Sequence, residues 1–269
     1  MSKSYDLSTS TKWANLADGD HVVKLRAKGA GYGSSSFSNS VTVTKGSAMP
    51  VKGDLITIES KQYRVLKTNG SVAEVLAMYD VTNSQVFGTD NTYAGSALDT
   101  YCNSTFYGTL STAMKNAIVE KTFKQDSWHF SWDVGTTLGS PKYIGYASDN
   151  DDYELSLVTA EFGTSISRKC YALSVQDVID YLEVTPSMTA ADTTLNPTNI
   201  WMMFWNQTAS PGSIYSWLCS TNSYARTSFY ARGSYGDVVD YSVDAIRGVR
   251  PAFQIDLSKI EWTPVGGGN

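Results

Sequence analysis

The chain has 269 residues and a mass of 29.4 kDa, with 42% hydrophobic and 12% aromatic residues and a formal net charge of −5. This length is enough for one large domain and a small one, and the acidic balance without a basic cluster argues against nucleic acid as a partner. No segment approaches the roughly 18 apolar residues of a membrane span, and the start lacks the apolar stretch of a signal peptide, so we expect no membrane insertion.

Residues 1–46 read as short strands. In residues 21–28 apolar side chains alternate with Lys and Arg, and residues 41–44 alternate again. Three such strands alone expose an apolar face and are marginally stable in water, so this segment is either truncated or packed on its neighbour. Small residues and Pro50 predict a boundary at residues 46–52.

A second domain is predicted at residues 53–262. It begins with a meander of three strands, at residues 55–58, 63–67 and 73–78. Each strand is short and apolar, and the connections are short polar turns. These strands are expected to form one antiparallel sheet.

Helices are predicted in the middle of this domain. Residues 96–103 and 111–119 have helical patterns, and Ser174 has the S-x-x-D capping pattern before residues 175–182. Short strands are expected to follow at residues 200–205, 216–218 and 249–255. Helices early and a loop-rich β region late predict an α+β fold.

The segment from Leu218 to Phe253 has an unusual composition. Its 36 residues contain no Lys, Glu, Gln, Met or Trp, although these types are about a fifth of average sequence. None of the five has a codon that ends in a pyrimidine, whereas the Tyr, Ser, Arg, Gly and Asp of this segment do. Randomised first and second bases of Asn codons would give such a segment, and so would a contact surface rich in Tyr and Ser. A static Tyr-rich loop is the alternative.

The residues of reactive chemistry are few and scattered. Cys102, Cys170 and Cys219 are widely spaced and are expected to be separate thiols, without a disulfide framework or a zinc site. His129 lies in an aromatic run and is expected to be structural. The acidic run at residues 149–154 is expected to be a solvated turn, with calcium binding as the alternative. We therefore expect no catalytic residues, no metal and no cofactor.

Several motifs of the second domain carry a family resemblance. GDLITI at residues 53–58, AEVLAMYD at 73–80, GSALDTYCNSTFY at 95–107 and GVRPAF at 248–253 resemble a C-type-lectin-like domain common in Firmicutes and their phages. That group is related in fold to formylglycine-generating enzymes. It includes the variable proteins of diversity-generating retroelements, in which a reverse transcriptase rewrites template adenines. Residues 1–46 resemble the last three strands of an immunoglobulin-like or fibronectin-III-like module.

The resemblance implies an α+β, C-type-lectin-like fold with a small N-terminal all-β segment and a variable region at about residues 218–247. Within that region Ser220, Phe229, Gly236, Val238 and Val243 are assigned to the framework. The remaining positions are assigned to a ligand-binding surface: Tyr224, Arg226, Ser228, Tyr230, Arg232, Ser234, Tyr235, Asp237, Val239, Asp240, Tyr241, Asp244, Ala245 and Arg247.

The sequence thus favours a diversified binding protein over an enzyme. The implied partner is a protein or glycan ligand on a cell surface, and the implied location is a virion or a cell surface, of phage or gut-bacterial origin. A formylglycine-generating-type enzyme and a structural surface module without diversification are the alternatives. The aromatic run at residues 200–205 is expected to be buried in the hydrophobic core, and an exposed sugar-binding platform is the alternative.

Overall fold

A computed structural model describes most of the chain, in two compact units, Met1–Met49 and Pro50–Asn269. The division lies inside the segment 46–52. The structure describes residues 11–14, 16, 19–24, 26, 34, 36–37, 39–45, 49–78, 82–131, 154–182, 215–223, 226–232 and 237–265.

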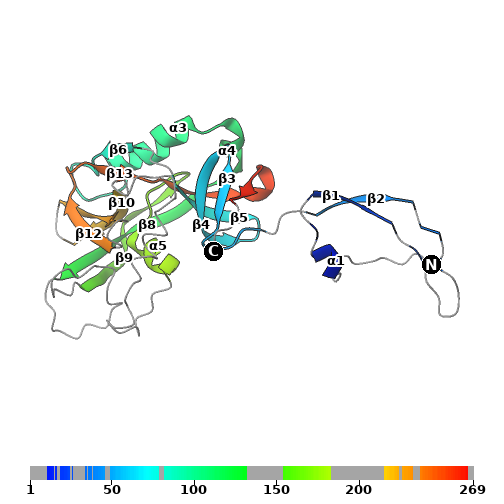
Figure 1. The fold of residues 1–269 in the computed structure, drawn as a ribbon. Helices are drawn as coiled ribbons and strands as arrows, with labels where there is room; N and C mark the ends of the chain where they lie inside the picture. Colours follow the sequence, from blue (N-terminus) through cyan, green and yellow to red (C-terminus); the bar gives the residue numbers. More distant parts are fainter. Residues whose placement is uncertain are drawn as a thin grey trace. The chain divides into compact units, whose positions relative to one another are not determined.

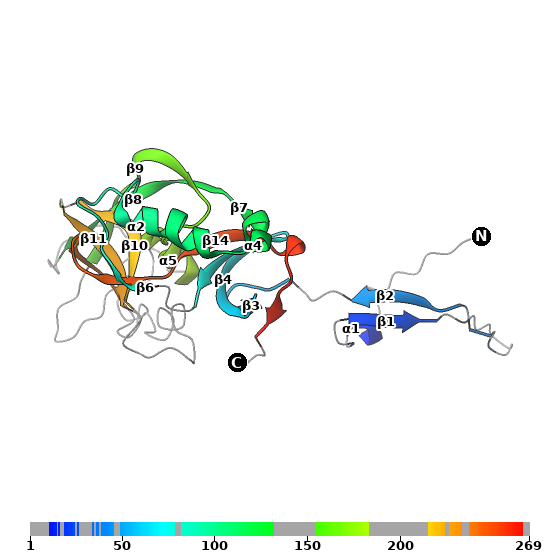
Figure 2. The ribbon, with the colours of Figure 1, turned by 90° about the horizontal axis from the view of Figure 1, so that it is seen from above.

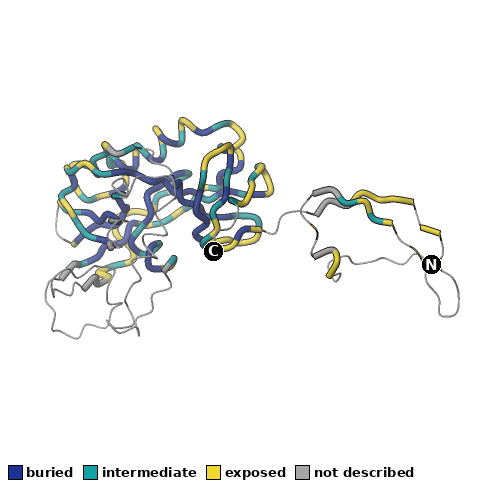
Figure 3. The backbone as a smooth tube through the Cα atoms, viewed as in Figure 1, coloured by how far each residue is buried: buried dark blue, intermediate teal, exposed yellow. Residues whose placement is uncertain are grey.

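Unit 1 contains helix α1 (Thr11–Ala14) and an antiparallel pair of strands, β1 (Gly19–Val23) and β2 (Val41–Lys45). Val22 and Val41 are 66% and 60% exposed. Figure 3 shows the described part of this unit as exposed or half-buried. A two-stranded sheet with solvated valines gains little from burial. The described residues of this unit contain two strands where three were expected.

The described residues of unit 2 form two sheets (Figures 1 and 2). The six-stranded sheet is entirely antiparallel, in the order β15-β3-β4-β5-β14-β7. It contains the predicted meander, β3 to β5, because each of these strands has apolar residues to bury. Its strands are β3 (Leu55–Ile58), β4 (Lys61–Asn69), β5 (Val72–Ala77), β7 (Ile118–Val119), β14 (Ala252–Asp256) and β15 (Thr263–Pro264).

The seven-stranded sheet is mixed and has the order β12-β11-β10-β13-β6, with β8 pairing with both β10 and β9. Strand β10 lies parallel to β13 and β8 and antiparallel to β11. Its strands are β6 (Thr82–Gln85), β8 (Lys121–Ser131), β9 (Glu154–Arg168), β10 (Tyr215–Asn222), β11 (Thr227–Arg232), β12 (Asp237–Ser242) and β13 (Arg247–Val249).

The three segments of unit 2 predicted as helices contain helices, although residues 118–119 of the second segment form strand β7. Ser96 Oγ accepts from the Asp99 amide, and Ser111 Oγ accepts from the Met114 amide, each closing the first turn of a helix. All are short: α2 (Ala97–Thr100), a π-helix η2 (Tyr101–Phe106), α3 (Tyr107–Thr109), α4 (Thr112–Ala117), α5 (Val175–Leu182) and a 3-10 helix η4 (Leu257–Lys259).

The expected α+β, C-type-lectin-like fold is wrong. Strands make up about half of the described residues and helices about a fifth, so the described chain is mostly β. The error came from segments in which no strand was predicted, including β8, β9, β11 and β12. Strand β8 buries Gln125, Asp126 and Ser127, and such polar residues hide the apolar alternation by which a strand is recognised.

A charged cluster is centred on Glu74, on strand β5 of the six-stranded sheet. The Glu74 carboxylate is buried, and it accepts from Tyr171 Oη at 2.5 Å and pairs with Lys121 and Lys67 at 2.8 Å each. Burial alone raises the pKa of Glu74, but the charge and hydrogen bond of Lys121, with the bonds from Lys67 and Tyr171, outweigh it and lower this pKa to about 2. The folded state therefore binds this proton less tightly than the unfolded chain.

Replacing Glu74 by Gln should change how stability depends on pH. The unfolded pKa of Glu is about 4.3, so the stabilisation from ionised Glu74 is fully present above about pH 5 and is lost as the pH falls through about 2. The lowering of the Glu74 pKa by about two units on folding corresponds to a contribution of about 3 kcal/mol to the free energy of unfolding. Urea unfolding measured from pH 7 to pH 2 should show that the wild-type chain is more stable than E74Q at pH 7 and that this difference in unfolding free energy disappears in the acid window. If the unfolding free energies of the two chains changed in parallel with pH, the lowered pKa of Glu74 would be contradicted.

Unit 2 is expected to fold without unit 1, because both buried apolar clusters contain only residues from Leu55 onward. Deleting residues 1–45 should leave the calorimetric unfolding transition of unit 2 at its temperature in the full chain. A loss of that transition would show that the first strands belong to its core.

Candidate functional site

Strand register brings many of the predicted ligand-binding positions to one face of the seven-stranded sheet. Residues opposite each other in an antiparallel pair point to the same side. Tyr230 lies opposite Trp217 on β10 and Val239 on β12, and Ser228 lies opposite Tyr241. We call this side the Tyr-Arg face. Its described members are Tyr215, Trp217, Ser228, Tyr230, Val239, Tyr241 and Arg247.

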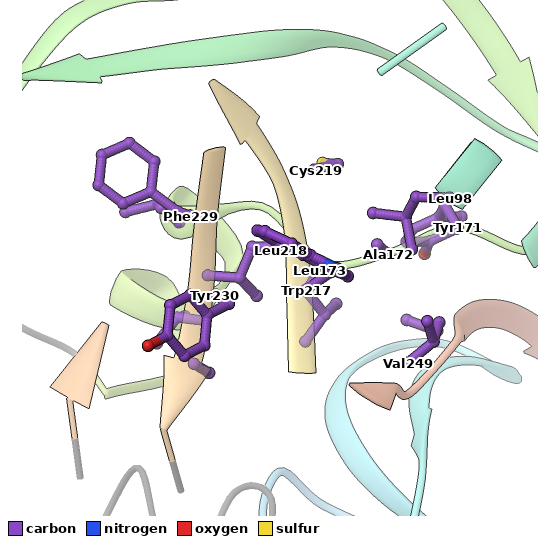
Figure 4. Packing of buried hydrophobic residues seen from close by; sticks show 14 of the residues in the cluster. Leu98, Tyr171, Ala172, Leu173, Trp217, Leu218, Cys219, Phe229, Tyr230 and Val249 are labelled. Carbon is purple, nitrogen blue, oxygen red and sulfur yellow. The ribbon is translucent and has the colours of Figure 1, made fainter. Parts of the chain in front are cut away.

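The other side of the same strands is core. Phe229 and Val238 are at most 1% exposed, and so is Ala231 between them in the sheet. Figure 4 shows Phe229, Leu218 and Leu173 among the residues of this buried cluster. The assignment of Ser220, Phe229, Val238 and Val243 to the framework is confirmed by their burial, and Gly236 lies outside the described residues.

A row of aromatic rings runs along the Tyr-Arg face. The ring centroids of Phe87 and Trp217 are 5.7 Å apart, those of Trp217 and Tyr230 are 5.8 Å apart, and those of Tyr230 and Tyr241 are 6.4 Å apart. Edge-to-face pairs at these distances contribute beyond their buried area. The row connects the buried Trp217 to Tyr241, which is 51% exposed.

Arg247 lies at the exposed end of this row. Tyr230 and Tyr241 are perpendicular to each other, at 89°, and the Arg247 guanidinium carbon lies 4.8 Å from the first ring centroid and 4.5 Å from the second. We call these three side chains the aromatic corner. Two cation–π contacts hold the Arg247 side chain in one orientation.

The predicted ligand-binding positions differ in exposure. Arg226, Tyr241 and Asp244 are exposed, and Val239, Asp240, Ala245 and Arg247 are half-buried. Tyr224, Ser234 and Tyr235 lie outside the described residues, and only the backbones of Arg232 and Asp237, paired in register, are described.

Two of these positions were wrongly expected to be exposed. Ser228 is 0% exposed and its hydroxyl donates to the Ser220 carbonyl at 2.6 Å. Tyr230 is 6% exposed because rings from both neighbouring strands cover it, together with Arg247. Both residues form the base of the Tyr-Arg face, whereas a ligand can reach Tyr241 and Asp244.

The segment at residues 86–97 also borders the candidate surface, which the sequence did not indicate. The amides of Phe87 and Gly88 both donate to the Val243 carbonyl. Asn91 Nδ2 donates to the Asn222 carbonyl at 2.9 Å, and Asn222 Nδ2 donates to Asp240 at 2.7 Å. These bonds fix the connection between β12 and β13. A cavity of about 410 Å³ lies beside it, lined by residues that include Gly88, Asp90, Thr92 and Ser96.

Buried polar side chains of β8 form hydrogen bonds with β10, the central strand of the Tyr-Arg face. Gln125 on β8 donates to the Cys219 carbonyl at 2.7 Å, and Ser220 Oγ donates to Asp126. Asp126 also accepts from Trp128 Nε1 at 2.7 Å. Burial raises the pKa of Asp126, partly offset by these hydrogen bonds.

The thiols and histidines show little reactive geometry. All three cysteines are buried and free, and burial raises the pKa of each thiol. His129 is half-buried and its Nδ1 lies 3.2 Å from Ser223 Oγ.

The described residues contain no cluster of three His, Cys, Asp or Glu side chains suited to a metal, and no helix among them is long and apolar enough to cross a membrane. Residues 149–153 and 200–205 lie outside the described residues, as does the Glu154 side chain.

A family model described as "Domain of unknown function (DUF6273)" matches residues 66–257. The chain belongs to this family. The match extends from β4 to η4 and includes every strand of the Tyr-Arg face. No curated protein and no solved structure matches the chain.

Alanine substitutions should separate the base of the Tyr-Arg face from its exposed positions. Tyr230→Ala removes a buried ring with three ring neighbours and should cost about 3–5 kcal/mol of unfolding free energy. Asp244→Ala, at an exposed position of the same segment, should change it by less than about 0.5 kcal/mol. Urea unfolding of the two variants tests this, and equal costs would show that Tyr230 is not part of the packing.

Proposed function

We propose that this chain is a binding protein whose Tyr-Arg face and adjoining connections contact a macromolecular ligand on a cell or virion surface. The observation that carries the proposal is the two-sided use of β11 and β12. Phe229 and Val238 secure the sheet from one side, while the Tyr241 ring and the Arg247 side chain extend from the other. Tyr and Arg are the residues that dominate contact energy in protein interfaces.

We further propose that this surface is diversified by a retroelement. The absence of Lys, Glu, Gln, Met and Trp from residues 218–253 is a property of codons, and packing alone gives no reason for it. An exposed position such as Asp244 tolerates substitution because a solvated side chain loses few contacts when it is replaced. Mutation directed at adenines would therefore change the surface while the buried face keeps the sheet folded.

An enzyme of the formylglycine-generating type is the competing proposal. Such a reaction needs an accessible thiolate, and Cys219 is 1% exposed with its thiol pKa raised by burial. This observation favours binding over turnover. A Cys219→Ser variant that keeps its ligand would agree with binding, and one that loses an oxidase activity would favour the enzyme.

Sequencing the gene's locus and sister copies tests the diversification. A neighbouring reverse transcriptase and a near-identical adenine-rich repeat are expected. Copies should differ at Arg226, Asp240, Tyr241, Asp244 and Arg247 and at the other predicted surface positions, such as Tyr224, Arg232, Tyr235 and Asp237, while Val238, Gly248, Arg250 and Pro251 stay fixed.

Burial adds a second expectation for those copies. Tyr230 should vary over fewer residue types than Tyr241, because it is 6% exposed against 51%. Free use of Lys or Glu at the surface positions would contradict diversification and favour a static Tyr-rich surface.

A further inference from the structure

Arg247 is a partly dehydrated cation for which the described residues supply no anion. No ion pair of the described residues includes it. Its Nη1 donates to the neighbouring Ile246 carbonyl at 2.9 Å, and its buried Nε has no hydrogen-bond partner. A buried donor without a hydrogen-bond partner destabilises the folded state.

The two tyrosine rings orient Arg247 without using its hydrogen-bond donors. Cation–π contacts engage the charge, whereas the N–H groups lie in the guanidinium plane and point outward from its edge. That edge matches the two oxygens of a carboxylate. Because Nε is buried and one Nη1 hydrogen is donated to the Ile246 carbonyl, the donors left for a ligand are those at the Nη1–Nη2 end. A ligand that binds this end need not order a long side chain first.

The shape of the surroundings favours a protein segment as the ligand. The Tyr-Arg face spans adjacent strands, β10 to β13, and Tyr241 stands exposed beside Arg247, which suits a broad partner surface. The chain carries a net charge of −5, so long-range attraction does not bring an acidic ligand to it. Recognition of an acid here must come from a local cation.

We infer that Arg247 determines the specificity of the Tyr-Arg face, and that its guanidinium edge takes an Asp or Glu carboxylate of a protein ligand while Tyr241 packs against the adjoining residue. This inference rests on the proposed binding function and names the chemistry of its ligand.

The test uses hexaglutamate as probe and the arginine Nε–Hε NMR signals of the full chain as readout, at 0.15 M salt. The Arg247 signal should shift saturably with hexaglutamate and stay unchanged with a neutral Gly-Ser peptide of equal length. Arg247→Met removes the charge and the donors but keeps an unbranched side chain, and should weaken binding about tenfold or more. Arg26→Met makes the same substitution at an exposed arginine of unit 1 that lies over the Phe37 ring; it is the matched control and should bind as the wild type does.

Circular dichroism and urea unfolding check that the variants remain folded. Should R247M unfold, Arg247→Lys replaces it, because Lys keeps the charge but lacks the planar fork, and it should also weaken binding. Equal binding of hexaglutamate by wild type and by the folded variant would overturn the inference, as would a response to glucuronate but not to the peptide. In either case variation among sister copies would still support the proposed function, so the two failures are distinguishable.

Discussion

A single buried carboxylate connects the elements on which the candidate surface rests. Asp126 on β8 accepts from Ser220 on β10, from Trp128 within β8, and from the Gln176 amide in the first turn of α5 at 3.2 Å. The Ser220 hydroxyl in turn accepts from the Val175 amide at 2.7 Å. Because a buried carboxylate must keep its partners, strands β8 and β10 and helix α5 are fixed relative to one another. Strand β10 then sets the register of β11, and β11 sets that of β12.

That fixed register explains how one segment serves both packing and recognition. The alternation of a strand sends Phe229 to the core and Tyr230 to the Tyr-Arg face, and a slip of one residue would exchange them. Beneath β10, the buried Gln125 satisfies its amide with the Cys219 and Asn91 carbonyls and the Tyr93 amide. Such a satisfied network specifies one pairing, so the surface side chains can differ without loss of register.

Apolar patterning made part of this fold predictable. The meander β3 to β5 and helix α5 were predicted because their apolar residues follow strand and helix periods. Strand β8 was missed because it buries Gln125 and Asp126, whose hydrogen-bond partners, apart from Trp128, lie more than 30 positions away in the sequence. At the site, Phe229 and Val238 were placed in the framework correctly. Tyr230 was not, since its burial depends on Tyr215, Trp217 and Arg247, and their proximity arises only when the strands pair.

The aromatic corner shows why exposure alone does not define a recognition surface. Tyr241 is half-exposed, yet its ring contributes to the position of Arg247, and Tyr230 is nearly inaccessible but forms the other wall. A ligand that touched only Arg247 and Tyr241 would still depend on Tyr230 for the orientation of both. Diversification would therefore act unequally along β11 and β12, because a change at the base alters the geometry of its neighbours as well as its own contact. The surface is best regarded as a layered structure, with a packed aromatic base and an outer set of residues that a ligand meets.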